Sequence, residues 1–207
     1  MLLEGSCHCG AIRFRVESPE PYPFMRCYCS ICRKTAGGGG HAVNFGALSG
    51  TLEVEGEDNL SVYNAKLYDR GDAGEVPASE AERNFCGLCG SFLWLFSPSY
   101  PELVHPFASA IDTLLPKPPE RYHIMLDYAA PWCEIPSTPA ERHFPGCGTA
   151  HKGWIEILQR RRGDERGVQA LRQRKPIEHE HNGASAEDSD DRAQHCLLCQ
   201  YREHVLP

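Results

Sequence analysis

The chain has 207 residues and a formal net charge of −7 at pH 7. Neutralising nucleic-acid phosphates needs clustered basic residues, so this acidic balance argues against nucleic-acid binding as the main activity. The first residues lack the basic leader and apolar run of a signal peptide, and no later stretch is apolar enough for a membrane span. The odd cysteine count, eleven, fits a reducing compartment. We therefore expect a cytoplasmic protein without a membrane anchor.

Short strand patterns, separated by Gly, Pro, Asn and Asp, follow one another along the first two thirds of the chain. Residues 11–16 alternate apolar and charged side chains, as in a strand with one buried face. Residues 91–96 carry large apolar side chains on both faces, which predicts a strand buried on both sides. Further strand patterns lie at residues 51–54, 60–63, 103–108 and 121–126. No long amphipathic helix interrupts them, so the sequence predicts a mainly β domain of twisted antiparallel sheets.

The C-terminal quarter of the chain differs from the rest in composition. Residues 156–207 contain nine Leu, Ile, Val or Phe among 52 residues, too few to offset the entropy of ordering the chain. Basic residues gather at 160–175 and acidic residues at 178–191. The sequence therefore predicts a charged, poorly ordered tail over residues 156–207.

Seven of the eleven cysteines lie in three tight clusters. Two thiols one or two residues apart can both face one metal ion, whereas a disulfide between such close neighbours would be strained. The simplest partition gives a closed four-thiol site and a three-thiol site that keeps a coordination position for water or substrate. The first site consists of Cys7, Cys9, Cys86 and Cys89, and the second of Cys27, Cys29 and Cys32. Free buried thiols or a redox set are the disfavoured alternative, because three such clusters rarely arise without metal.

The sequence around these cysteines resembles one known family. The motifs are GSCHCG at residues 5–10, RCYCSICRK at 26–34 and NFCGLCGS at 84–91, followed by AID at 110–112. These segments are similar to the glutathione-dependent formaldehyde-activating enzyme family, also called the CENP-V/GFA domain family. The resemblance implies a zinc-binding domain over residues 3–145 with the Mss4-like fold, a mainly β arrangement of sheets held together by zinc.

The resemblance also implies two zinc ions with different roles. The ion at the four-thiol site would be structural, whereas Cys27, Cys29 and Cys32 would hold a catalytic ion. The family's named reaction joins glutathione and formaldehyde to S-hydroxymethylglutathione, and the reverse direction is a carbon–sulfur lyase activity. Zinc lowers the pKa of a bound thiol and so favours the thiolate that attacks a carbonyl, which agrees with a thiol substrate.

Glutathione is anionic, so its carboxylates need cations near the three-thiol site. Arg26, Arg33 and Lys34 are the nearest in sequence, although each could equally be a solvated surface residue. His41 is a candidate proton shuttle or fourth metal ligand. The glycines at 37–40 could offer backbone N–H groups to a peptide-like ligand or could simply form a flexible loop.

Two classes of function stay open from the sequence. In the first, the chain is a zinc-dependent enzyme of the carbon–sulfur lyase type that acts on a glutathione-like thiol and a small aldehyde such as formaldehyde. In the second, both zinc ions are architectural and the domain is a non-catalytic interaction module or glutathione carrier. The cysteines outside the seven-cysteine pattern are Cys133, Cys147, Cys196 and Cys199. The last two, with neighbouring histidines, could bind a third metal ion.

Overall fold

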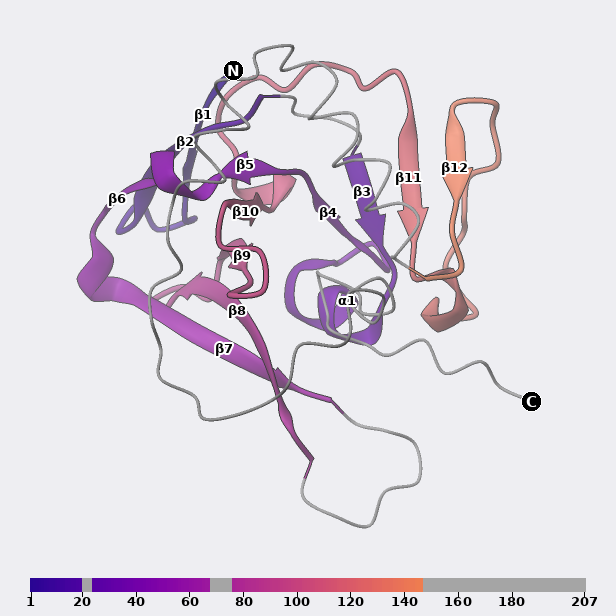
Figure 1. The fold of residues 1–207 in the computed structure, drawn as a ribbon, viewed down its shortest axis with the longest axis horizontal. Helices are drawn as coiled ribbons and strands as arrows, with labels where there is room; N and C mark the ends of the chain where they lie inside the picture. Colours follow the sequence, from indigo (N-terminus) through magenta and orange to yellow (C-terminus); the bar gives the residue numbers. More distant parts are fainter. Residues whose placement is uncertain (20–23, 68–75, 147–207) are drawn as a thin grey trace, which may run out of the picture.

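The structure, a computed structural model, describes residues 1–19, 24–67 and 76–146 of the chain. Within these residues the fold is mainly β, with sheets of three, five and four strands and one short α-helix (Figure 1). Most neighbouring strands are antiparallel, as the sequence predicts. None of the described helices is both long and apolar enough to cross a lipid bilayer.

The three-stranded sheet leads directly into the first cysteine pair. Its strands, in spatial order, are β1 (Leu2–Ser6), β2 (Arg13–Glu17) and β6 (Glu53–Glu55). Phe14 and Val16 of β2 are buried, whereas Arg13 and Arg15 are exposed, which confirms the predicted alternation. Cys7 follows β1 immediately, so the register of this sheet fixes where its thiol lies.

The five-stranded sheet carries the second cysteine pair. Its order is β5 (Ala47–Leu48), β10 (Leu103–Pro106), β9 (Phe92–Phe96), β8 (Ala78–Cys86) and β7 (Leu60–Lys66), all antiparallel. Leu93, Trp94 and Leu95 are buried one after another, so β9 is buried on both faces, as expected. Cys86 ends β8, and Cys89 lies in the turn between β8 and β9.

The four-stranded sheet contains the only parallel pairs among the described strands. Its order is β12 (Glu141–His143), β11 (Arg121–Ile124), β3 (Phe24–Cys27) and β4 (Ala42–Asn44). β11 runs parallel to β3 and to β12, whereas β3 and β4 are antiparallel. Parallel neighbours need a long crossover, and here the chain passes through most of the other two sheets between β3 and β11. Side-chain alternation carries no signal of strand direction, so the sequence did not predict these pairs.

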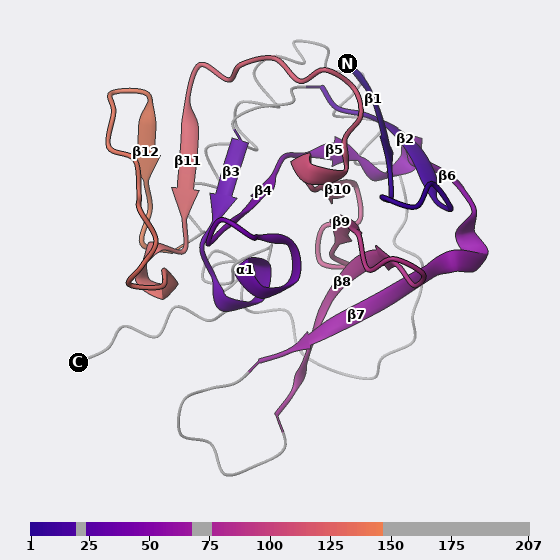
Figure 2. The same cartoon turned by 180° about the vertical axis from the view of Figure 1, so that it is seen from behind.

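Two clusters of buried side chains form the interior. The first lies between the three-stranded and five-stranded sheets, where the rings of Phe14 and Trp94 meet edge to face with centroids 5.1 Å apart. The second joins the four-stranded sheet, α1 (Ser30–Ala36) and the inner face of the five-stranded sheet. Seen from behind, α1 lies between β8 and the four-stranded sheet (Figure 2). This second cluster contains Cys27, Cys29 and Cys32.

Short 3₁₀ helices account for most differences between the predicted and observed strand ends. They span Ser49–Thr51, Glu57–Asn59, Ala108–Ala110 and Leu126–Tyr128. The first replaces the start of the strand predicted at 51–54, and the last two shorten the strands predicted at 103–108 and 121–126. β8 escaped prediction because its buried face consists of Ser79, Ala81 and Arg83 rather than large apolar residues.

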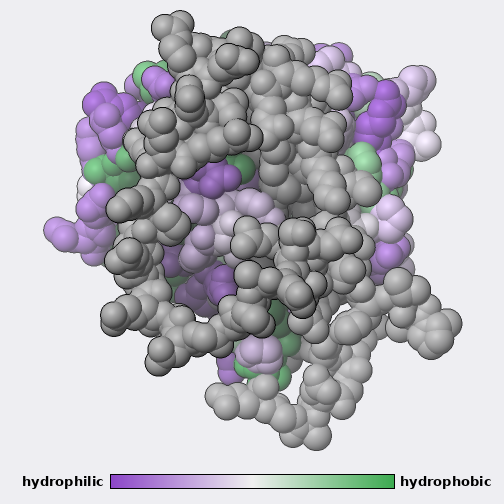
Figure 3. All heavy atoms as spheres, viewed as in Figure 1, coloured by the Kyte–Doolittle hydropathy of each residue, from purple (hydrophilic) through white to green (hydrophobic). Residues whose placement is uncertain are grey.

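Hydrophilic side chains lie along the two lateral edges of the molecule, near β6 and near β12 (Figure 3). These are edge strands of their sheets, and β6 exposes Glu53 and Glu55. Charged side chains on an edge strand oppose pairing with another chain. The tail predicted over residues 156–207, together with Cys147, Cys196 and Cys199, lies outside the described residues.

Candidate metal centres and ligand cleft

The four predicted thiols from the two distant cysteine pairs lie together. The sulfur ligand atoms of Cys7, Cys9, Cys86 and Cys89 are all within 4.8 Å of one another. Cys7 Sγ lies 3.5 Å from Cys9 Sγ, and Cys9 Sγ lies 3.8 Å from Cys86 Sγ across 77 residues of sequence. The group therefore ties the β1–β2 turn to the β8–β9 turn, as the sequence partition requires.

Each turn of this four-thiol group closes with a glycine in the left-handed region. Gly10, at φ 74°, donates its N–H to the carbonyl of Cys7, and Gly90, at φ 73°, donates to the carbonyl of Cys86. Other residues rarely adopt this φ, so the glycines allow each chain to turn tightly after its second cysteine. The two turns thus aim both thiols of each pair at one point.

The thiols of this group differ in acidity. Ser91, through its side chain and backbone, lowers the pKa of Cys89 to about 5. The backbone N–H of Ala11 lowers the pKa of Cys9, but the neighbouring thiols of Cys7 and Cys89 outweigh it and raise that pKa to about 12. Each of these thiols makes ionisation of its neighbours less favourable. A bound cation would stabilise the thiolates by offsetting that repulsion.

The second group is assembled locally by the end of β3 and the start of α1. Cys27 ends β3, Cys29 is the N-cap of α1, and Cys32 lies in the first turn of the helix. The three sulfur atoms lie within 4.8 Å of one another, and the thiol of Cys29 accepts the backbone N–H of Cys32 at 3.3 Å. The helix cap and the thiol cluster are therefore one local structure.

The three-thiol group is fully buried. Cys27, Cys29 and Cys32 are each 0% exposed, whereas Cys9 and Cys89 of the other group are exposed. Hydrogen bonds with Cys27 and Cys29, followed by burial and by charge repulsion between the thiols, raise the pKa of Cys32. Thiolate sulfur is a soft ligand that suits zinc and copper(I), so either group could hold a metal ion.

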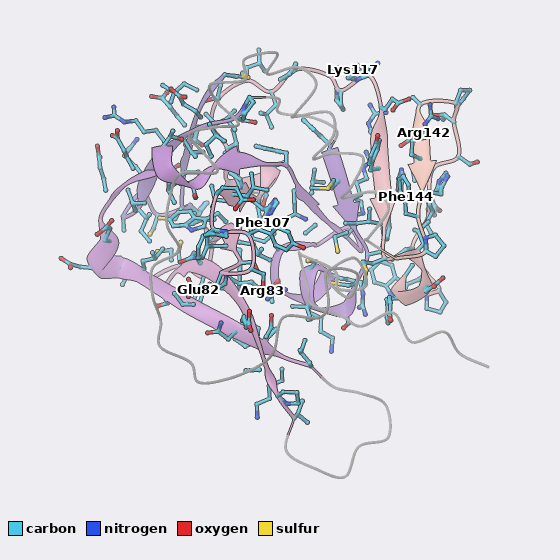
Figure 4. All side chains as sticks on the ribbon, in the orientation of Figure 1. Glu82, Arg83, Phe107, Lys117, Arg142 and Phe144 are labelled. Carbon is cyan, nitrogen blue, oxygen red and sulfur yellow. The ribbon has the colours of Figure 1, made fainter. Side chains whose placement is uncertain are left out.

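A buried cation, Arg83, lies on the strand that contributes Ala81 to the core cluster of the three thiols. Arg83 of β8 is 0% exposed and lies on the same strand face as Ala81, which packs in the core cluster of Cys27, Cys29 and Cys32. Figure 4 shows Arg83 and Phe107 in the interior of the molecule. Sequence reasoning missed Arg83, because a single arginine in a polar strand carries no signal of burial.

A chain of hydrogen bonds begins at Tyr28, between two of the predicted ligands. The hydroxyl of Tyr28 lies 2.9 Å from Nδ1 of His123, and Nε2 of His123 lies 2.7 Å from a carboxylate oxygen of Glu141. The other oxygen of Glu141 accepts from Arg121 at 3.2 Å. Tyr28 directly follows β3, whereas the others come from β11 and β12, so only the tertiary structure brings these residues together.

The protonation states of His123 and Glu141 follow from their surroundings. Burial raises the pKa of Glu141, but the hydrogen bond from His123 and the charges of Arg121 and Arg26 outweigh burial, so the pKa is lowered. Burial also lowers the pKa of His123, despite the opposing effect of Glu141. Near pH 7, His123 is therefore neutral and Glu141 is ionised.

His41 and Arg26, two of the residues singled out in the sequence, lie beside Tyr28. The ring of His41 is 5.0 Å from that of Tyr28, and its Nδ1 is buried without a hydrogen-bond partner among the described residues. Burial, followed by the charge of Arg26, lowers the pKa of His41. Within the described residues, both thiol groups consist of cysteines alone, and neither includes His41.

Arg33 and Lys34, the other two predicted cations, line a cleft of about 630 Å³. They belong to the last turn of α1, so one short helix contributes both to the thiol group and to the cleft. The Nε of Arg33 is buried and has no hydrogen-bond partner in the described parts of the chain. Asp112, which accepts a 2.7 Å hydrogen bond from Ser6, lines the same cleft, so both signs of charge are present.

The glycine run is constrained at its two ends. A side chain on Gly37 would meet the backbone of His41, and one on Gly40, at φ 87°, would meet Cys133 and Trp132. The middle of the run is open at Gly38, which also lines the cleft. The thiol of Cys133 is partly buried and donates a weak hydrogen bond to the carbonyl of Gly40 at 3.7 Å.

Comparison with known proteins agrees with the resemblance seen in the sequence. The family described as glutathione-dependent formaldehyde-activating enzyme matches residues 2–126. A Halomonas elongata protein, provisionally named as an enzyme of this kind, is 58% identical over 146 residues, which cover 70% of this chain and 88% of that protein. A crystal structure of a Rhodobacter sphaeroides protein is 28% identical, covers 55% of this chain and 91% of its own, and gives a TM-score of 0.40. The chain belongs to the glutathione-dependent formaldehyde-activating enzyme family.

Proposed function

We propose that the chain is a zinc-dependent enzyme of the carbon–sulfur lyase type that joins a glutathione-like thiol to a small aldehyde such as formaldehyde. The observation that carries this proposal is the position of helix α1. Its first turn presents Cys29 and Cys32 to the three-thiol group, and its last turn presents Arg33 and Lys34 to the cleft. Membership of the family supports the thiol and the aldehyde as substrate classes.

The two thiol groups take different roles in this proposal. Cys7, Cys9, Cys86 and Cys89 hold a structural zinc ion that links two hairpins, and no substrate position remains on it. Zinc held by Cys27, Cys29 and Cys32 would lower the pKa of the substrate thiol and so supply a thiolate at neutral pH.

The cleft supplies the contacts to the peptide part of the thiol. Arg33 and Lys34 pair with its carboxylates, and Asp112 accepts from its ammonium group. The backbone at Gly37 and Gly38 can approach a ligand closely, because no side chain intervenes. Arg26 lies with Tyr28 and His41 rather than in the cleft, so we assign it to the environment of those residues instead of to the ligand.

The reaction forms one bond and moves one proton. A sulfur lone pair forms the S–C bond as the carbonyl π bond opens, and the proton lost by the thiol ends on the former carbonyl oxygen. His41 is our candidate to carry that proton, because its lowered pKa keeps the imidazole neutral and its buried Nδ1 has no partner among the described residues. In the lyase direction each of these changes reverses.

Calorimetry and a rate assay test this function together. We expect zinc-loaded protein to bind glutathione more tightly than S-methylglutathione, because the methyl group blocks the sulfur. We also expect NMR with ¹³C-formaldehyde to show the hydroxymethyl adduct forming faster than in a protein-free control. Equal binding of the two ligands would exclude contact between the sulfur and the metal.

One observation favours a second candidate, a glutathione carrier or interaction module without turnover. The three thiols are 0% exposed and are not among the residues that line the cleft, so a substrate must reach them by movement of the residues around α1. Binding that depends on the free thiol, with no rate above the control, would select this candidate over the enzyme.

A further inference from the structure

The hydrogen-bonded chain from Tyr28 to Glu141 has no role in the chemistry above, yet it starts inside the three-thiol segment. Tyr28 lies between Cys27 and Cys29 in sequence, and all three residues are 0% exposed. Its backbone N–H donates to the carbonyl of Ile124 at 3.1 Å, which extends the parallel pairing of β3 and β11 by one residue. The segment 27–29 is therefore fixed to β11 by both its backbone and its tyrosine side chain.

The direction of each hydrogen bond follows from the acceptor at the end. An ionised Glu141 can only accept, so Nε2 of His123 carries the proton and donates to it. The neutral ring then has an unprotonated Nδ1, so the hydroxyl of Tyr28 donates to His123. Arg121 and Thr138 donate to the other carboxylate oxygen of Glu141, at 3.2 and 3.5 Å. Tyr28, His123 and Glu141 therefore each have a defined hydrogen-bond partner.

Ring stacking holds the same residues in place. The ring of Tyr28 stacks on that of His123 with centroids 5.7 Å apart, and His123 stacks on His143 at 5.0 Å. His143 in turn lies 2.8 Å, through Nε2, from the carbonyl oxygen of Pro136. Rotation of Tyr28 would break both the stack and the hydrogen bond, so its backbone can move little. Cys27 and Cys29, on either side of it, are held by the same restraint.

We propose that Tyr28, His123 and Glu141 are positioning residues for the metal ligands Cys27 and Cys29. Hydrogen-bonded partners behind the ligands set how closely a donor group is held to the geometry a metal needs. The inference rests on the proposed function only in that the three thiols hold a metal ion. It does not require turnover of any aldehyde.

Equilibrium competition for zinc tests the proposal on full-length protein. We expect the wild type to bind two equivalents, and Cys32→Ser identifies the equivalent that belongs to the three-thiol group. Tyr28→Phe removes only the hydroxyl and Glu141→Gln removes only the charge, and each should weaken that one equivalent about tenfold. The matched control is Glu120→Gln. Glu120, next to the start of β11, pairs with the exposed Arg142 of β12, and no described hydrogen bond joins it to Tyr28, His123 or Glu141.

Cobalt(II) adds a readout that does not depend on activity. With cobalt bound, Tyr28→Phe should shift the visible d–d bands of the three-thiol equivalent and leave the remaining bands unchanged, and Glu120→Gln should shift neither. Wild-type zinc affinity and unchanged cobalt bands in both Tyr28→Phe and Glu141→Gln would overturn the proposal. Equal weakening of both equivalents would also overturn it, because that pattern indicates general destabilisation.

Failure of the proposed function gives a different result. Suppose that the wild type binds two zinc ions, that Tyr28→Phe weakens only the ion at the three-thiol group, and that no adduct forms. The positioning role would then stand, and the proposed enzymatic function would be wrong. Wild-type protein with no zinc at the three-thiol group would overturn both. Thermal melts of the variants should stay cooperative, and Glu141→Gln serves as the second variant if Tyr28→Phe does not fold.

Discussion

The thiol of Cys29 accepts the backbone N–H of Cys32 at 3.3 Å, so one candidate metal ligand is also the N-cap of α1. The first turn of a helix has unpaired N–H groups that a side chain at the cap must satisfy. Helix formation and ligand placement are thereby coupled in the three-thiol group.

This coupling predicts different outcomes for serine at two cysteines. Cys29→Ser keeps a capping oxygen, so α1 should form and stability should change little, although the metal ligand is lost. Cys86→Ser removes one ligand of the four-thiol group, whose bound metal would link Cys9 to Cys86 across 77 residues of sequence. By analogy with covalent cross-links of that loop length, it should lower the free energy of unfolding by about 4 kcal/mol. Urea unfolding of both zinc-loaded variants measures the difference, and equal losses would contradict the division of roles.

A second prediction concerns the two exposed thiols of the four-thiol group. In metal-free protein at pH 7, Cys89 should react with iodoacetamide well before Cys9, because the pKa of Cys89 is about 5 and that of Cys9 about 12. Mass spectrometry of peptides after short exposures gives the order. Bound zinc should protect both thiols. Cys27, buried in the other group, is the internal control and should react last while the protein stays folded. Modification of Cys9 and Cys89 at the same rate would contradict the difference between their pKa values.

The sequence indicates which thiols lie together because metal-ligand spacing is a local signal, whereas metal binding by these thiols stays a prediction. Cys27, Cys29 and Cys32 form one turn of structure, and the two distant pairs are recognisable as pairs before their meeting is known. The hydrogen-bonded chain was not predictable, because Tyr28, His123 and Glu141 meet only through parallel pairing of β11 with strands on either side. The different positions of Arg26 and Arg33 were also not predictable, because they depend on tertiary structure. Arg26 of β3 lies near His41, whereas Arg33 at the end of α1 lines the cleft.

The cleft predicts a charge-specific loss of glutathione affinity. Arg33→Gln should weaken binding at least about tenfold, because charge-assisted hydrogen bonds contribute about 1.5 kcal/mol or more. Lys34→Gln should weaken it less, by about twofold to fivefold, since an exposed ion pair contributes under about 1 kcal/mol. Asp112→Asn should weaken binding of glutathione but not of a thiol that lacks the amino group, such as 3-mercaptopropionate.

Calorimetry on zinc-loaded protein makes these comparisons, with Lys66→Gln as the matched control. Lys66 is an exposed lysine of β7 that does not line the cleft. A loss in Lys66→Gln equal to that in Lys34→Gln would show a general electrostatic effect. Undiminished affinity in Arg33→Gln would remove the cleft as the site of the carboxylates.

The final prediction is a dependence of stability on pH that originates at Glu141. Its pKa is lower in the folded chain than the ordinary value of 4.5, so the unfolded chain binds the proton more tightly. The carboxylate therefore adds stability above pH 4.5, and this contribution is lost as the pH falls through the lower, folded pKa. The pKa of His123 is also lowered from 6.5, so its neutral form adds stability that declines on acidification below that value. The test compares the free energy of unfolding from pH 7 to pH 3 in Cys32→Ser protein with Glu141 and with Glu141→Gln, because Glu141→Gln alone would also weaken zinc binding at the three-thiol group. Zinc release from the four-thiol group is then common to both proteins. The advantage conferred by Glu141 should persist down to about pH 4.5 and shrink below it. A constant advantage over the whole range would show that Glu141 contributes through its shape and packing, and that its charge has no part in holding His123.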